Sequence, residues 1–189
     1  VDARLCISYL TVELQGAIPV ALRPLIGNRI YGCDDCQLCC PWNRFAHIGD
    51  PDFAVRNGLD AAPLTALFAW DEEQFNAHLA GSAIRRIAHR RWLRNIAVAL
   101  GNAPTSPAVL AALVGRQDDP SALLREHVGW ALAQHAESTS GEIVLMTDRV
   151  RSALPPGCAA GTTRRMTSLT YWGVGSTATL GRDPADVLR

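Results

Sequence analysis

Four of the six cysteines in this chain lie within eight residues, in the segment GCDDCQLCCP. Cysteine thiolates are soft ligands that suit zinc and iron–sulfur clusters. Bacterial iron–sulfur loops follow the pattern C-x₂-C-x₂-C-x₃-C-P, in which the cysteine before proline binds the second of two clusters. Here Cys33, Cys36 and Cys39 keep the first spacings, whereas the Cys40-Pro41 pair comes three residues early. The pattern therefore predicts an iron–sulfur loop.

Zinc and disulfides are the two alternatives for these cysteines. A structural zinc site usually has a second C-x₂-C or a pair of histidines. Only His47 follows the loop closely, and no C-x₂-C partner exists elsewhere in the chain, so the cysteine–proline ending favours iron–sulfur over zinc. A disulfide framework is disfavoured, because the adjacent Cys39 and Cys40 could pair only under strain. Cys6 and Cys158 stand apart, and we expect Cys158 to be an idle thiol.

The overall charge and hydropathy exclude two classes of protein. Eighteen basic residues balance eighteen acidic ones, so no net field draws the chain to nucleic acid or to a membrane surface. No apolar run approaches the ~18 residues of a membrane span, which excludes a transmembrane protein. The chain begins with Val1 rather than Met and has no leader pattern. We therefore expect a piece of a longer protein.

The elements that position the cysteines are short and occupy residues 1–50, the first expected domain. The run CISYLTVEL at 6–14 is rich in β-branched and aromatic residues, which favours a strand, with a short helix as the alternative. Pro19 and Pro24 bracket an expected helical turn that Gly27-Asn28 closes.

Residues 51–137 form the second expected domain and have a helical period. Asp71 and Gln74 indicate a capping box, and Gly101-Asn102 indicates a helix end. The expected helices cover 63–70, 71–79, 83–102, 107–115 and 121–135. Short helices in antiparallel pairs suggest a HEAT-like stack, with an ordinary helical bundle as the alternative. Trp92, Trp130, His89, His127 and His135 are expected to have structural roles.

Residues 138–189 are rich in Ser, Thr, Gly, Pro and Arg and show no sustained period. This composition predicts a mostly disordered tail, with at most a short ordered piece around 143–151.

The long segment DARLCISYLTVELQGAIPVALRPLIGNRIYGCDDCQLCCPWNRFA resembles the epoxyqueuosine reductase family after its first cluster motif. LFAWDEEQF and AIRRIAHRRWLRNIAVALGNAP resemble the HEAT-like C-terminal domain of that family, so the resemblance covers residues 1–137. It implies a mainly α protein in which a ferredoxin-like iron–sulfur segment precedes HEAT-like repeats. The family ends soon after the helix at 121–134, and the different tail suggests a frame shift or a fusion.

The activity implied by this resemblance is that of an oxidoreductase. The family uses cobalamin and two [4Fe–4S] clusters to remove the epoxide oxygen of epoxyqueuosine in the anticodon loop of tRNA, which completes queuosine biosynthesis. Carried over to this sequence, Cys6, Cys33 and Cys36 would bind one cluster with a cysteine that precedes Val1. Cys40 would bind the other cluster.

Three further expectations follow from the resemblance. Cys39 stands where the family usually has an aliphatic residue; we expect a small buried side chain in the intact protein and a substitute ligand in this chain alone. Ser8 and Tyr9 would lie near the corrin. No catalytic residue falls in this chain, which alone should be inactive.

The implied partners are the tRNA anticodon stem-loop and an external electron donor, with no membrane, in a cytoplasmic monomer. Two other classes of function remain open from the residues. One is a stand-alone ferredoxin-like electron carrier, and the other is a HEAT-type binding module stabilised by zinc.

A basic segment could contact the tRNA. Residues 81–102 carry five arginines and no acid, and positions 86, 90 and 94 repeat every four residues. One helix face could therefore present guanidinium groups to phosphates. The alternative is a solvated face paired with the acidic residues 71–73. The candidate tRNA-binding residues are Arg85, Arg86, Arg90, Arg91 and Arg94.

Overall fold

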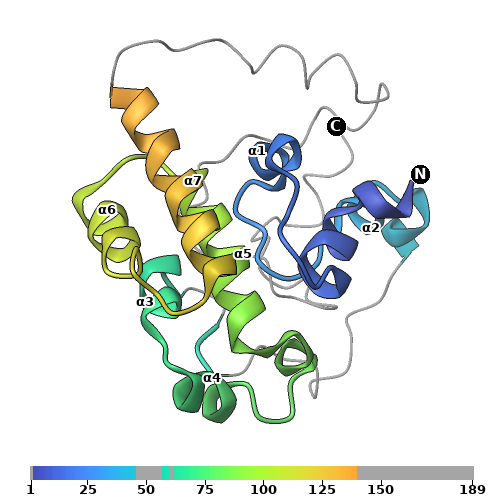
Figure 1. Ribbon diagram of the computed structural model, residues 1–189. Coiled ribbons are helices and arrows are strands. Elements are labelled where there is room, and N and C mark those ends of the chain that lie inside the picture. The colour runs from blue at the N-terminus through green and yellow to red at the C-terminus, as the bar shows by residue number, and fades with distance from the viewer. Residues whose placement is uncertain (1, 46–56, 60–61, 140–189) are drawn as a thin grey trace.

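The computed structural model describes residues 2–45, 57–59 and 62–139 (Figure 1). Every element in these ranges is helical, so the mainly α expectation is confirmed and the described residues contain no strand. No helix in them is long and apolar enough to cross a membrane. His47, Cys158, the piece expected at 143–151 and the tail after residue 139 lie outside the described residues.

The N-terminal part is a series of short helices joined by turns. Asp2 caps the first of them by accepting a hydrogen bond from the Arg4 backbone N–H. Gly27, with a φ of 63°, ends the turn expected between Pro19 and Pro24. The elements are η1 (Ala3–Leu5), η2 (Tyr9–Glu13), η3 (Val20–Leu22), α1 (Arg23–Ile26), α2 (Asp35–Leu38) and η4 (Pro41–Phe45).

The strand expected at 6–14 is wrong, and the alternative of a short helix holds. Residues 7 and 8 are α-helical and lead into η2, a π-helix in which the Leu14 N–H reaches the Tyr9 carbonyl at 2.9 Å. β-Branched residues favour strands only where a neighbouring strand offers them a pleated surface. Here the segment packs against a helix instead, and tertiary contact overrides local preference.

The second half consists of longer helices whose starts follow the sequence signals. The Asp71 capping box is present in full, and Ser106 caps the helix that begins with Pro107. The elements are α3 (Leu64–Ala69), α4 (Glu72–His78), η6 (Ala83–Ile87), α5 (Ala88–Gly101), α6 (Pro107–Val114) and α7 (Ala122–Thr139).

The single helix expected at 83–102 is instead two elements. Residues 83–87 form the 3₁₀ helix η6, and α5 follows. The break lies at Ala88, whose φ of 58° is rare for a residue with a Cβ and incompatible with a continuous α-helix. Arg85 and Arg86 therefore lie on a different element from Arg90, Arg91 and Arg94.

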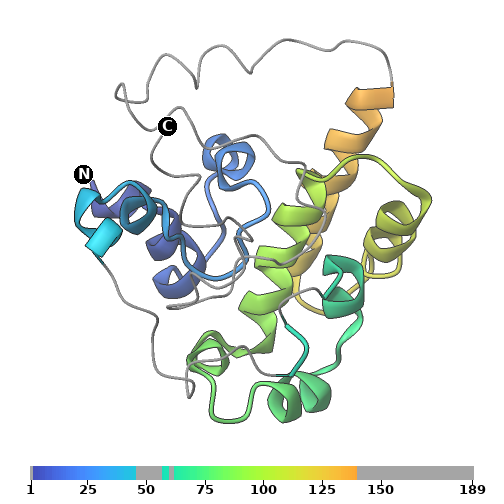
Figure 2. The ribbon, with the colours of Figure 1, turned by 180° about the vertical axis from the view of Figure 1, so that it is seen from behind.

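Helix α5 is the centre of the molecule. Figures 1 and 2 show the N-terminal elements on one side of α5 and α7, and α3 and α6 on the other. One apolar cluster joins Ile30 to Trp92 and the later helices, and a second joins Leu10, Ile18 and Ile26 to Val98 of α5. Among the described residues, no buried side-chain nitrogen or oxygen lacks a hydrogen-bond partner.

Candidate functional site

Five cysteines lie in the described residues, and all five carry thiols rather than disulfides. Cys6, Cys33 and Cys40 are partly buried, whereas Cys36 and Cys39 are exposed. The disulfide alternative thus finds no support here. Cys39 is exposed in this chain, and the expectation that it is buried concerns the intact protein and stays a prediction.

Two hydroxyl groups hold the cysteine loop beside the helix that follows Cys6. The Ser8 Oγ accepts a hydrogen bond from the Cys33 N–H at 3.0 Å. The Thr11 Oγ1 accepts one from the Gly32 N–H at 2.8 Å and donates to the Ile7 carbonyl at 2.7 Å. Thr11 is fully buried. Cys6 and Cys33, far apart in sequence, are thereby kept on adjacent segments.

The remaining cysteines lie on α2 or directly after it. The Cys39 N–H donates to the Asp35 carbonyl at 3.0 Å, and the Cys40 N–H donates to the Gln37 carbonyl at 3.1 Å. Residues three positions apart on a helical turn lie on the same side, so Cys39, the C-cap of α2, lies on the side of Cys36, whereas Cys40 follows beyond the helix. The Arg29 guanidinium fastens this turn by donating to both Asp35 oxygens at 2.8 Å.

The donor chemistry of this region fits a thiolate-bound metal cluster, but the described thiols do not form a closed metal site. In the described ranges, no three His, Cys, Asp or Glu residues lie close enough together to hold a metal ion. Burial raises the pKa of the Cys33 thiol, and the backbone N–H of Asp35, which favours the thiolate, offsets this only in part. A soft metal cation would stabilise the thiolate form of Cys33, because metal binding displaces the thiol proton.

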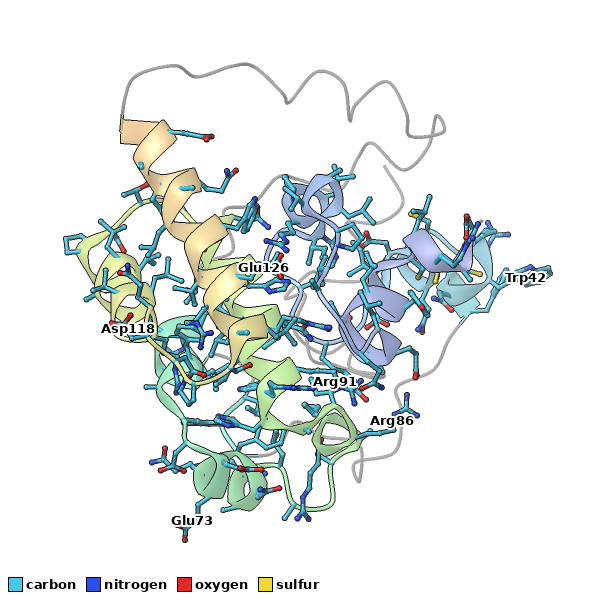
Figure 3. The ribbon with its side chains drawn as sticks, in the orientation of Figure 1. Trp42, Glu73, Arg86, Arg91, Asp118 and Glu126 are labelled. Atoms are coloured by element: carbon cyan, nitrogen blue, oxygen red, sulfur yellow. The ribbon has the colours of Figure 1, made fainter. Side chains whose placement is uncertain are left out.

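The five candidate arginines do not form one surface. Arg85, Arg86 and Arg90 are exposed, and Figure 3 shows Arg86 at the edge of the fold. Arg85 donates to the Asn76 amide oxygen at 2.9 Å. Arg86 does not pair with the acidic residues 71–73, as the alternative supposed; in the described part of the chain its salt-bridge partner is Glu13 of η2.

Arg94 and Arg91 point inward, which corrects the face expected from positions 86, 90 and 94. Arg94 is fully buried and donates to backbone carbonyls, so it cannot reach a phosphate. Arg91 is half-buried and donates to the Val12 carbonyl at 2.9 Å. Burial, with the positive charges of Arg91 and Arg90, lowers the pKa of Arg94 to about 10, so it stays charged at neutral pH.

The sequence analysis missed the polar residues that join the two halves of the molecule. Asn95 is buried and donates to the carbonyls of Thr11 and Ile30, each at 2.8 Å. The sequence does contain one indication of this role. Asn95 follows an arginine and begins an apolar run, and a polar side chain in such a buried run needs hydrogen-bond partners. The acceptors, however, are backbone groups 84 and 65 residues away, which no local pattern reveals.

The aromatic and histidine residues have the structural roles expected of them. Trp92 is buried in the core, and Trp130 packs partly buried against both apolar clusters. His89 lies 2.8 Å from the Trp70 carbonyl. His127 accepts a hydrogen bond from the Ile18 N–H at 3.1 Å, and His135 lies 3.0 Å from the Leu100 carbonyl.

Comparison with known proteins gives consistent matches. Residues 1–43 match the sequence profile of a family described as a 4Fe-4S double cluster binding domain. An epoxyqueuosine reductase of Xanthomonas campestris is 67% identical over 135 residues, covering 71% of this chain. One of Pseudomonas aeruginosa is 59% identical over 138 residues, covering 72% of this chain. The chain spans 38% of the length of each of these relatives.

The fold is also similar to solved structures. A crystal structure of an epoxyqueuosine reductase, with a tRNA-Tyr stem loop carrying the epoxyqueuosine modification, aligns with a TM-score of 0.63 and 28% identity. The alignment covers 69% of this chain and 35% of that one. The similarity therefore extends well past the cysteines into the helices that surround them.

Proposed function

We propose that this chain is part of an epoxyqueuosine reductase, the part that supplies iron–sulfur ligands and contacts the tRNA substrate. The observation that carries the proposal is the coincidence of two matches. The double-cluster profile covers the residues that hold five thiols, and the reductases match at 59% to 67% identity well beyond that profile. Neither an independent electron carrier nor a zinc-stabilised scaffold accounts for identity over the whole helical part.

The proposed cluster ligands are those that the similarity to the reductases implies. We assign Cys6, Cys33 and Cys36 to one [4Fe–4S] cluster, whose fourth ligand belongs to the rest of the reductase, and Cys40 to a second cluster. Such clusters supply one-electron transfer. The Ser8 and Thr11 hydroxyls support the assignment, because they hold the Cys33 loop against the helix that follows Cys6.

The remaining chemistry belongs to groups beyond the described residues. In this proposal a cobalamin cofactor performs the reduction, an external donor supplies electrons, and this chain contributes no catalytic residue. Tyr9 is partly exposed and can face the corrin. Ser8, the other residue expected there, uses its hydroxyl on the Cys33 backbone, which leaves it a supporting role.

The proposed arrangement comprises a ferredoxin-like segment in residues 1–50 and HEAT-like repeats in residues 51–137. A cytoplasmic monomer fits a tRNA-modifying enzyme of this kind.

Cluster binding is tested by anaerobic reconstitution of the chain with iron and sulfide. Visible absorbance with matching iron and sulfide counts is expected, since an iron–sulfur cluster absorbs there and zinc, with its filled d-shell, does not. A colourless chain that retains zinc would refute the assignment.

For tRNA, the structure narrows the candidate surface to Arg85, Arg86 and Arg90. Phosphate contacts depend on charge and weaken with salt, by roughly one unit of logarithmic slope for each contact. Charge reversal of Arg86 and Arg90 to Glu should therefore weaken binding of the anticodon stem-loop and lower that slope by about two units. Arg125→Glu on α7 is the matched control. Unchanged affinity and slope, with intact circular dichroism, would leave these arginines as solvated side chains only.

A further inference from the structure

The helix that follows Cys6 ends with backbone carbonyls that its own turns cannot satisfy. The last carbonyls of any helix need partners from outside it. Here three side chains of α5 provide them. Arg94 donates to the carbonyls of Leu10 at 2.9 Å, Leu14 at 2.7 Å and Gly16 at 2.6 Å. Arg91 and Asn95 take the carbonyls between, those of Val12 and Thr11.

These donors are committed to their acceptors. Arg94 is 0% exposed and Asn95 1% exposed. Within the described residues the Arg94 guanidinium bonds no carboxylate. Its acceptors are backbone carbonyls and the Asn95 amide oxygen, the latter at 3.0 and 2.9 Å. A buried charge is tolerated only where its hydrogen bonds are complete. The cation also lies at the negative end of the helix dipole, which favours it further.

The opposite side of the same helix holds the cysteine loop. Thr11 makes hydrogen bonds on both sides of the helix. Its carbonyl accepts from Asn95 at 2.8 Å, and its hydroxyl accepts from the Gly32 N–H at 2.8 Å. The next amide along, that of Cys33, donates to Ser8 one turn earlier. A continuous series of hydrogen bonds thus runs from α5 to the backbone of Cys33.

We propose that Arg94 and Asn95 are positioning residues, which set the placement of Cys33 relative to Cys6 through the helix that carries Ser8 and Thr11. The proposal rests on the proposed function, in which these two cysteines bind one cluster. Neither residue touches a cysteine. Arg94 acts by fixing the helix, and the helix fixes the loop through its two hydroxyl groups. Asn95 fixes the helix too and also holds the chain two residues before Gly32, by donating to the Ile30 carbonyl at 2.8 Å.

The direct test compares Thr11→Val with Thr11→Ser. Valine keeps the shape and removes the hydroxyl, whereas serine keeps the hydroxyl. In the metal-free chain, the Gly32 and Cys33 amides should exchange hydrogen about tenfold faster in Thr11→Val, because a lost buried hydrogen bond favours local opening. Thr11→Ser should exchange like the unaltered chain. Equal exchange in both variants would overturn the role of Thr11.

The series of hydrogen bonds that runs from α5 through the helix to Cys33, called the relay, is tested by Arg94→Met. Arg90→Met is the matched control on the same helix. Arg94→Met should speed exchange at Gly32 and Cys33, although it touches neither, and Arg90→Met should not. If Arg94→Met does not fold, Asn95→Leu removes the bonds to the Thr11 and Ile30 carbonyls without removing a charge. Faster exchange in Thr11→Val alone, with both α5 variants unchanged, would overturn the relay.

A cluster-dependent measurement then separates this inference from the function on which it rests. After reconstitution, Thr11→Val should lose iron to a chelator about tenfold faster than Thr11→Ser. If no variant assembles a cluster, the proposed function fails, while the exchange result still decides the relay. If clusters assemble and all variants lose iron at one rate, the positioning role is refuted and the function stands.

Discussion

His127 should make the stability of the fold depend on pH. Its ring is fully buried on α7, with one nitrogen 2.7 Å from the Leu123 carbonyl and the other accepting from the Ile18 N–H. This pattern requires a neutral ring that carries its proton on Nδ1. Protonation would set a second N–H against that of Ile18. Burial, with help from the positive charge of Arg23, lowers the pKa of His127 from 6.5 to about 4.

The sign and size of the effect follow from proton linkage. Between pH 6.5 and pH 4 the unfolded chain binds a proton that the folded chain excludes, so stability falls as pH falls through this window. The full loss is about 3 kcal/mol, of which about 2 kcal/mol has gone by pH 5. Chemical denaturation of the metal-free chain at several pH values measures it.

The control variants isolate His127 from the other titrating groups. His127→Gln keeps a hydrogen-bond acceptor without titrating there, so its stability should be flatter with pH across this window, whatever its absolute value. His78→Gln, at an exposed position on α4, is the control for the replacement of one histidine elsewhere. Parallel slopes in the unaltered chain and His127→Gln would show that His127 does not carry the pH dependence, and the reasoning from its burial would fail.

Two further predictions concern packing and ligand identity. A Cβ at Gly101 would lie 2.6 Å from the Trp130 ring and 2.9 Å from Ala131, so Gly101→Ala should lower the free energy of unfolding, measured by chemical denaturation, by about 1–3 kcal/mol. A Cβ at Gly129 would meet nothing within 4 Å, so Gly129→Ala should instead raise that free energy by up to about 1 kcal/mol. Equal effects of the two substitutions would contradict the close approach of α5 and α7. In the reconstituted chain we expect at most one [4Fe–4S] cluster, with Cys39 substituting for the ligand that the rest of the reductase supplies and Cys40 left without a metal. Iron and sulfide counts should therefore fall in Cys39→Ala and persist in Cys40→Ala, and the reverse would refute the substitution.

Helix ends and the core were predictable from sequence because their causes are local. Asp71 and Gln74 form a capping box with each other, and Pro107 begins a helix since its missing N–H is not needed there. The apolar period places Trp92 in the core. Each of these causes acts within one or two helical turns, so a local sequence pattern is enough to predict its effect.

The errors share a different cause, which is contact between distant segments. Local preference favoured a strand at 6–14, but the carbonyls of that segment are satisfied by side chains of α5. The period that placed Arg86, Arg90 and Arg94 on one face ignored the break at Ala88, which puts Arg86 on another element, and the backbone acceptors that draw Arg94 inward. A guanidinium on a helix is usually exposed, and only knowledge of its acceptors shows that this one is buried.

The same contacts decide how the two compositional regions of the chain relate to each other. The boundary at residue 50 separates a cysteine-rich segment from an Ala/Leu-rich one, yet it does not separate two cores. Val98 of α5 packs with Leu10 and Ile18, and Arg94 donates to three backbone carbonyls of the N-terminal segment. Without that segment, α5 would expose an apolar face and lose the partners of a buried cation, a combination that is strongly destabilising. The thiols are therefore carried on a segment whose shape the helical part maintains, and electron transfer and tRNA contact, in the proposed function, depend on one folded unit.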